Sequence, residues 1–149
     1  MGDTLIGSPL KSDWFTRLLD LEATSLVCFE DEQAAAIRQM WHLIDEAPDF
    51  RWIRGLRVPD QGRFECMLAA GYYQCAVESF FKPESTIMLS RDCTGYYLAT
   101  VVLPAGRSSE ACGDTPALAL VGALASVLAE DGLLLTDLDH PRVEARQAA

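Results

Sequence analysis

The chain has 149 residues, half of them hydrophobic, and a formal net charge of −10 at pH 7. This length suits one domain with its own core and is too short for two ordinary domains. The acidic balance argues against direct nucleic-acid binding, because phosphates repel a negative surface. The chain shows neither a signal-peptide pattern nor an apolar run long enough to cross a bilayer, so we expect a soluble, cytoplasmic protein without membrane contact.

The cysteines and histidines decide what redox, metal and thiol chemistry is open to the chain. Wide spacing, an odd number and the lack of a Cys-x-x-Cys pair favour reduced thiols over a disulfide framework. A zinc site would need ligands from unrelated segments, and a nucleophilic cysteine would have only His42 or His140 as a base. We therefore expect no metal, no cofactor and no catalytic residue. The cysteines are Cys28, Cys66, Cys75, Cys93 and Cys112.

The first third of the chain predicts two helices with a short strand between them. Residues 12–21 have the pattern of a short helix. Residues 26–29 are predicted to form the strand, and Asp31 then caps a helix over residues 32–46 that ends before Pro48. Two apolar stripes mark the buried faces of these helices, Trp14, Leu18 and Leu21 in the first and Ile37, Met40, Trp41 and Ile44 in the second.

A hairpin is predicted next. Residues 50–58 alternate between apolar and polar, Pro59 begins a turn, and residues 63–68 return as the partner strand. Residues 72–81 fit either a strand or a helical stripe, and we favour the strand. The hairpin would carry the one basic cluster of the chain, which we expect to pair with the acidic helices rather than to hold a phosphate. The cluster is Arg51, Arg54, Arg57 and Arg63.

The clearest strands follow at residues 86–89 and 96–103, which are rich in β-branched and aromatic side chains. Residues 104–113 are expected to form a surface loop. The last predicted helix has signals at both ends, Thr115 as N-cap before a proline and Gly132 beyond its C-terminus. Its side chains are apolar all round, so it must be covered on most sides.

These elements predict an α+β fold in which helices pack on both faces of an antiparallel sheet of four to five strands, as in an α/β/α sandwich. Residues 1–29 are expected to form an N-terminal extension, residues 30–135 the domain, and residues 136–149 a flexible tail. Residues 133–135, all leucine, are predicted to form a short edge strand or a lid. An unpaired edge there would allow a homodimer.

The order of the later elements resembles the phage ABA sandwich domain, a family of small bacteriophage and prophage proteins. The residues that carry the likeness are Gly95 to Val101 on the last strand and Asp114 to Leu120, with Ala123-Leu124, at the start of the final helix. A helix over residues 34–44 precedes them, and the resemblance covers residues 30–130. It implies a phage or prophage origin and supplies no catalytic residue.

The absence of a catalytic motif and an acidic, aromatic N-terminal third favour a binding protein. We expect a non-enzymatic phage or prophage accessory protein that binds a host protein through Trp14, Glu30, Asp31 and Glu32, and so inhibits a defence or regulatory component. The acidic face would either imitate nucleic acid or only confer solubility. The alternatives are a dedicated chaperone or immunity-type protein that holds one cognate partner, and, as the least favoured, a thiol-dependent enzyme.

Overall fold

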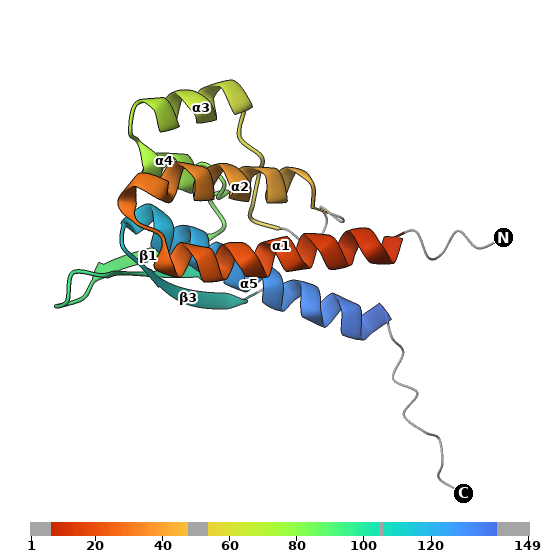
Figure 1. Ribbon diagram of the computed structural model, residues 1–149. Coiled ribbons are helices and arrows are strands. Elements are labelled where there is room, and N and C mark those ends of the chain that lie inside the picture. The colour runs from red at the N-terminus through yellow and green to blue at the C-terminus, as the bar shows by residue number, and fades with distance from the viewer. Residues whose placement is uncertain (1–6, 48–53, 105, 140–149) are drawn as a thin grey trace, which may run out of the picture.

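A computed structural model describes residues 7–47, 54–104 and 106–139 of the chain (Figure 1). Helices and strands occupy most of this part, with the strands gathered between residues 86 and 113. In chain order the elements are α1 (Gly7–Val27), the one-turn 3₁₀ helix η2 (Glu30–Glu32), α2 (Gln33–Asp45), α3 (Gln61–Ala69), α4 (Tyr73–Glu78), β1 (Thr86–Arg91), β2 (Tyr97–Val102), β3 (Ser108–Gly113) and α5 (Pro116–Asp139).

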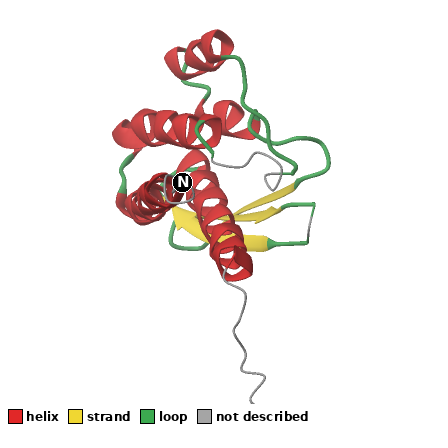
Figure 2. Cartoon of the chain, turned by 90° about the vertical axis from the view of Figure 1, so that its right-hand side faces the viewer, coloured by secondary structure: helices red, strands yellow, loops and turns green. Residues whose placement is uncertain are grey.

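The sheet is antiparallel, with β2 between β1 and β3. Helix α5 lies on β2 and β3, α1 packs beside α5 and also contacts β3, and α2 packs on α5 and α1 (Figures 1 and 2). Ala99 and Val101 of β2 face α5 and are buried, whereas Met88 and Glu110 on the other face are exposed. The α+β class is therefore confirmed, but the described part has three strands rather than four to five, and its helices cover one face rather than two.

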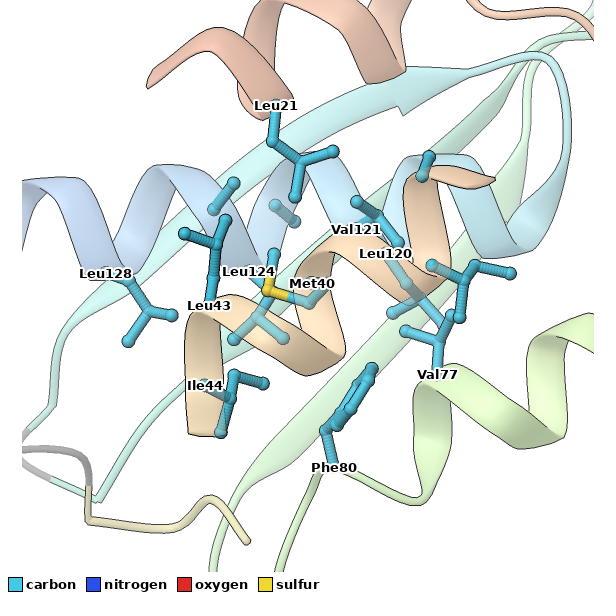
Figure 3. Close-up of a cluster of buried hydrophobic side chains, with 14 of the residues drawn as sticks. Leu21, Met40, Leu43, Ile44, Val77, Phe80, Leu120, Val121, Leu124 and Leu128 are labelled. Atoms are coloured by element: carbon cyan, nitrogen blue, oxygen red, sulfur yellow. The ribbon is translucent and has the colours of Figure 1, made fainter. Parts of the chain in front are cut away.

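Helix α5 forms the centre of the core, as its composition predicts. Its large side chains between residues 118 and 128 are fully buried and meet Met40, Leu43 and Phe80 of the neighbouring elements (Figure 3). Thr115 caps the helix, because its Oγ1 accepts a hydrogen bond from the N–H of Leu118 at 3.1 Å. The buried large side chains of α5 are Leu118, Leu120, Val121, Leu124, Val127 and Leu128.

The predicted end of this helix at Gly132 is wrong, because α5 continues to Asp139. A glycine inside a helix costs only about 1 kcal/mol relative to alanine, and the leucines that follow are good helix formers. Residues 133–135 are therefore helical and do not form an edge strand, so the pairing on which the predicted homodimer rested is not present. The predicted tail begins inside α5, and its residues 140–149 lie outside the described part of the chain.

Helix α1 extends the predicted N-terminal helix in both directions. Trp14, Leu18 and Leu21 are buried in the same hydrophobic cluster as α5, so the described part of the predicted extension belongs to the main core. Gly122 makes this packing close, because a Cβ there would lie 2.8 Å from Oγ of Ser25 in α1. The strand predicted at residues 26–29 is wrong, since α1 runs to Val27 and no neighbouring strand is in reach to pair with it.

The predicted hairpin after residue 50 is also wrong. Residues 63–68 belong to α3, where the Asp60 side chain accepts a hydrogen bond from the N–H of Arg63 and so caps the helix. Phe64 and Leu68, four residues apart, supply its buried face. In the proposed partner strand, residues 50–53 lie outside the described part, and Leu56 makes a single β-bridge.

Residues 72–81 contain helix α4 (Tyr73–Glu78) rather than the favoured strand, and Ala76, Val77 and the following Phe80 enter the core together. The strands predicted at residues 86–89 and 96–103 are confirmed as β1 and β2. The second half of the expected loop at residues 104–113 is strand β3. It pairs along its whole length with β2.

Candidate functional site

Trp14 is a core residue rather than a surface anchor. Its side chain is 2% exposed, and its Nε1 donates a buried hydrogen bond of 2.7 Å to the carbonyl oxygen of Leu43. This bond ties α1 to the last turn of α2. The tryptophan therefore offers no contact area to a partner, although the sequence places it among the candidate binding residues.

The three acidic residues do lie on the surface. Glu30, Asp31 and Glu32 form η2, the exposed 3₁₀ turn that joins α1 to α2. Carboxylates at a helix N-terminus are also favoured by the helix dipole, as we expect from the sequence. Both interpretations, helix-start charges and a contact surface, are compatible with this position.

Two large apolar side chains stand exposed directly before the acids. Val27 at the end of α1 is 70% exposed and Phe29 is 68% exposed. We use the name acidic end for the surface formed by Val27, Phe29, Glu30, Asp31, Glu32 and Asp114. It lies where α1 passes into α2 and where α5 begins, at the left of Figure 1. An exposed aromatic ring directly before three carboxylates in the chain combines an apolar anchor with charged neighbours.

A recess of about 310 Å³ opens in the acidic end between Glu30 and Asp114. Parts of the chain that are far apart in sequence meet there: η2, the first turn of α2, Gly71 before α4, the first turn of α4, the start of β2 and the N-terminus of α5. The side chains around it are carboxylates, amides and tyrosines. They are Glu30, Gln33, Tyr73, Gln74, Tyr97, Asp114 and Thr115.

Gln33 is the buried polar group of the recess, with 4% of its surface exposed. Its Oε1 accepts a hydrogen bond of 2.9 Å from Oγ1 of Thr115, the same hydroxyl that caps Leu118. Its Nε2 has no hydrogen-bond partner among the residues that the structure describes. A buried amide N–H₂ group without an acceptor costs about 1–3 kcal/mol. The recess therefore holds an unused hydrogen-bond donor.

Gly113 sets the position of the helix end beside the recess. A Cβ on this residue would lie 2.5 Å from the backbone nitrogen of Ala119 and 2.9 Å from the carbonyl carbon of Leu118. Only a glycine lets the end of β3 approach α5 so closely. The Gly-Asp-Thr-Pro sequence thus brings Asp114 and Thr115 to the lining of the recess.

The thiols differ in burial. Cys28 is buried, and burial together with a hydrogen bond to Glu32 raises the pKa of its thiol. A nucleophilic cysteine needs a lowered pKa, so this shift opposes thiolate chemistry. The other four cysteines are exposed. His42 is exposed on α2, and His140 lies outside the described part.

A wider hollow of about 880 Å³ lies between α3 and the segment before it. Arg57 and Arg63 line it together with Cys66 and Met67. The predicted pairing with an acidic helix is not seen for Arg57. Its Nε donates a hydrogen bond of 2.9 Å to the carbonyl oxygen of Ser79 instead. Arg51 lies outside the described residues.

The ion pairs within the described part use other arginines. Arg17 binds Glu46 at 2.7 Å and Arg38 binds Glu65 at 3.0 Å, so they join α1 to the end of α2 and α2 to α3. Over residues 7–47, 54–104 and 106–139, no three histidine, cysteine, aspartate or glutamate side chains are grouped as a metal site would require. No helix in these ranges combines the length and apolarity needed to span a bilayer.

Comparisons with known proteins find no match. This holds for protein-family profiles, curated protein sequences and solved structures alike. The acidic end and its recess are therefore the features that indicate a function. Sequence reasoning selected three members of this surface, Glu30, Asp31 and Glu32. It missed Gln33, whose position directly after the acidic triplet, at the start of an apolar helical stripe, was the one available signal.

Proposed function

We propose that the protein acts by binding a protein partner through the acidic end, without catalysing a reaction. The observation that carries this proposal is the exposure of Phe29 beside three adjacent carboxylates. Phe29 is exposed together with Val27, and exposed apolar side chains that are grouped rather than scattered mark protein interaction sites. The carboxylates would form a charged rim around it.

The partner surface that fits is basic. The chain carries a net charge of −10, and four of its carboxylates, Glu30, Asp31, Glu32 and Asp114, lie on the acidic end. Such a surface attracts lysine- and arginine-rich proteins and accelerates their association, because rim charges steer the encounter. A groove that normally binds nucleic acid is a surface of this kind.

We further propose a bacterial host protein as the partner, because the sequence resemblance alone implies a phage or prophage origin. A phage or prophage accessory protein of this type would inhibit the defence or regulatory component that it binds. A dedicated chaperone or immunity-type protein would use the same surface for one cognate partner. The identity of the captured protein distinguishes these two roles.

The test is a capture experiment from bacterial lysate with two triple variants of equal net charge. The first carries Glu30→Lys, Asp31→Lys and Glu32→Lys in the acidic end. The control carries Asp13→Lys, Asp20→Lys and Glu84→Lys at exposed positions elsewhere.

We expect the wild type and the control variant to retain the same basic protein, and the acidic-end variant to lose it. Purified partner should then associate at least tenfold more slowly with the acidic-end variant, and raised salt should reduce the wild-type rate in the same way, because exposed charges are screened within about 8–10 Å at physiological ionic strength. If both variants lose the captured protein equally, or if the association rate does not change with salt concentration, the acidic end is not the contact surface.

A further inference from the structure

The recess in the acidic end has the chemistry of a receptor for one side chain. Its volume of about 310 Å³ lies at the lower end of the range of about 300–1,000 Å³ found for ligand pockets. Two acidic residues, Glu30 and Asp114, line it together with the buried residue Gln33. A ligand that satisfies all three groups must bring a positive charge and a hydrogen-bond acceptor.

We infer that the recess binds an arginine side chain of the protein partner. The guanidinium would pair with Glu30 and Asp114, and the backbone carbonyl of the same arginine, or of the residue beside it, would accept from Nε2 of Gln33. This inference rests on the proposed function and names the group that the acidic end recognises. It also accounts for a buried donor that finds no acceptor among the described residues.

The tyrosines favour arginine over lysine. Tyr73 and Tyr97 line the recess, and a planar guanidinium stacks on such rings better than a compact ammonium does. The ring of Tyr97 already attracts a guanidinium within the chain, since the Cζ of Arg91 lies 5.7 Å from the ring centroid. Arginine also offers a fork of N–H donors to the two carboxylates.

A helix N-terminus usually binds an anion rather than a cation, and the recess does border the first turn of α5. Here, however, Pro116 has no N–H, the N–H of Leu118 is bonded to Thr115, and Asp114 carries a negative charge beside the helix end. These features remove donors and repel phosphate. The two lining carboxylates, Glu30 and Asp114, therefore favour a cation, even with the guanidinium of Arg91 on the ring of Tyr97.

The test uses the full chain and three capped pentapeptides, with two alanines on each side of arginine, lysine or citrulline. Citrulline has the shape of arginine without its charge. Binding is followed by two-dimensional ¹H–¹⁵N NMR at low salt, with the side-chain N–H₂ signals of Gln33 and the backbone N–H signals of Tyr97 and Ala117 as reporters.

We expect the arginine peptide to move these signals in a saturable way, and the citrulline peptide to bind at least tenfold more weakly. The double variant Glu30→Gln, Asp114→Asn should bind the arginine peptide at least fivefold more weakly than the wild type. Glu84→Gln, an exposed carboxylate in the turn before β1, should leave binding unchanged. The assignment is overturned if the Gln33 side-chain signals do not move at the highest concentration of arginine peptide. It is also overturned if the citrulline or lysine peptide binds as tightly as the arginine peptide.

The two proposals fail separately. If the acidic-end variant loses its protein partner while the arginine peptide leaves Gln33 unmoved, the contact surface stands and the arginine recess is wrong. If the peptide binds the recess while charge reversal leaves partner capture intact, the recess binds arginine but the protein partner uses another surface.

Discussion

Replacing Gly113 by alanine should strongly destabilise the protein, because the added methyl group has no space. It would meet three backbone atoms of α5 at 2.5, 2.9 and 3.0 Å, whereas carbon atoms in contact lie about 3.5–4.0 Å apart. The helix would have to move by about 1 Å from β3 to restore that spacing. Backbone in the first turns of a capped helix cannot yield as a flexible side chain does.

The expected magnitude follows from two opposing effects. Overpacking a closely packed site costs about 1–3 kcal/mol, and a rigid backbone neighbour places Gly113→Ala at the upper end of this range. In a strand, alanine stabilises the fold by about 0.5–1 kcal/mol relative to glycine, because the unfolded chain has less conformational freedom to lose. The free energy of unfolding should therefore fall by about 2 kcal/mol, a large share of the about 5–15 kcal/mol of a typical domain.

Urea unfolding followed by tryptophan fluorescence measures this change. Cys112→Ala is the matched control, because Cys112 is the preceding residue of β3, points to the open face of the sheet and is exposed. It should change the free energy of unfolding by less than about 0.5 kcal/mol. If Gly113→Ala unfolds at the same urea concentration as this control, the close approach of β3 to α5 is wrong.

Three further changes test other parts of the structure. Leu124→Asp should abolish cooperative unfolding, since an unpaired charge in this fully buried site costs several kcal/mol. Trp14→Phe should lower the free energy of unfolding by about 1–3 kcal/mol, as it leaves the buried Leu43 carbonyl without its donor, while partner capture stays unchanged. The pKa of Asp92 should lie below its ordinary value by NMR titration, because its carboxylate accepts hydrogen bonds, first from Thr94. The stability that this carboxylate adds should be present above the carboxyl pKa of the unfolded chain and be lost as the pH falls through the lower folded pKa, and Asp92→Asn should remove that dependence.

Elements with local signals could be predicted from the sequence. The start of α5 is determined by Thr115 and Pro116, and β2 by its own run of aromatic and β-branched residues. Strand β3 has neither signal, since Ser-Ser-Glu-Ala-Cys-Gly is polar and small. It is a strand because β2 pairs with it, and its glycine is needed by a helix that follows it in the chain.

The helices mistaken for strands show the limit of alternation as a signal. In residues 63–68, a period of two and a spacing of four both select Phe64 and Leu68, so the apolar pattern alone cannot decide between strand and helix. The cap from Asp60 decides it, because the side-chain oxygen satisfies the N–H of Arg63 at the helix start. The Pro59-Asp60 pair, which predicts a turn, is thus the start of helix α3.

The candidate site divides in the same way. Exposure of Glu30, Asp31 and Glu32 follows from their charge, which is costly to bury. The burial of Trp14 depends on a carbonyl 29 residues further along the chain, which no local pattern reveals. Aromatic content predicts an exposed aromatic anchor at Trp14, whereas the exposed ring in this third of the chain belongs to Phe29.

The hydroxyl of Thr115 joins the core to the recess. It accepts from Leu118, which holds the end of the central helix, and it donates to the buried amide of Gln33, which faces the recess. A ligand that engages Gln33 therefore acts on a group already linked to the helix cap. Because the same few atoms stabilise the fold and shape the recess, the amide is held in one position before any partner arrives. Such preorganisation reduces the entropy that binding must lose, which allows a small recess to add affinity to a charged surface.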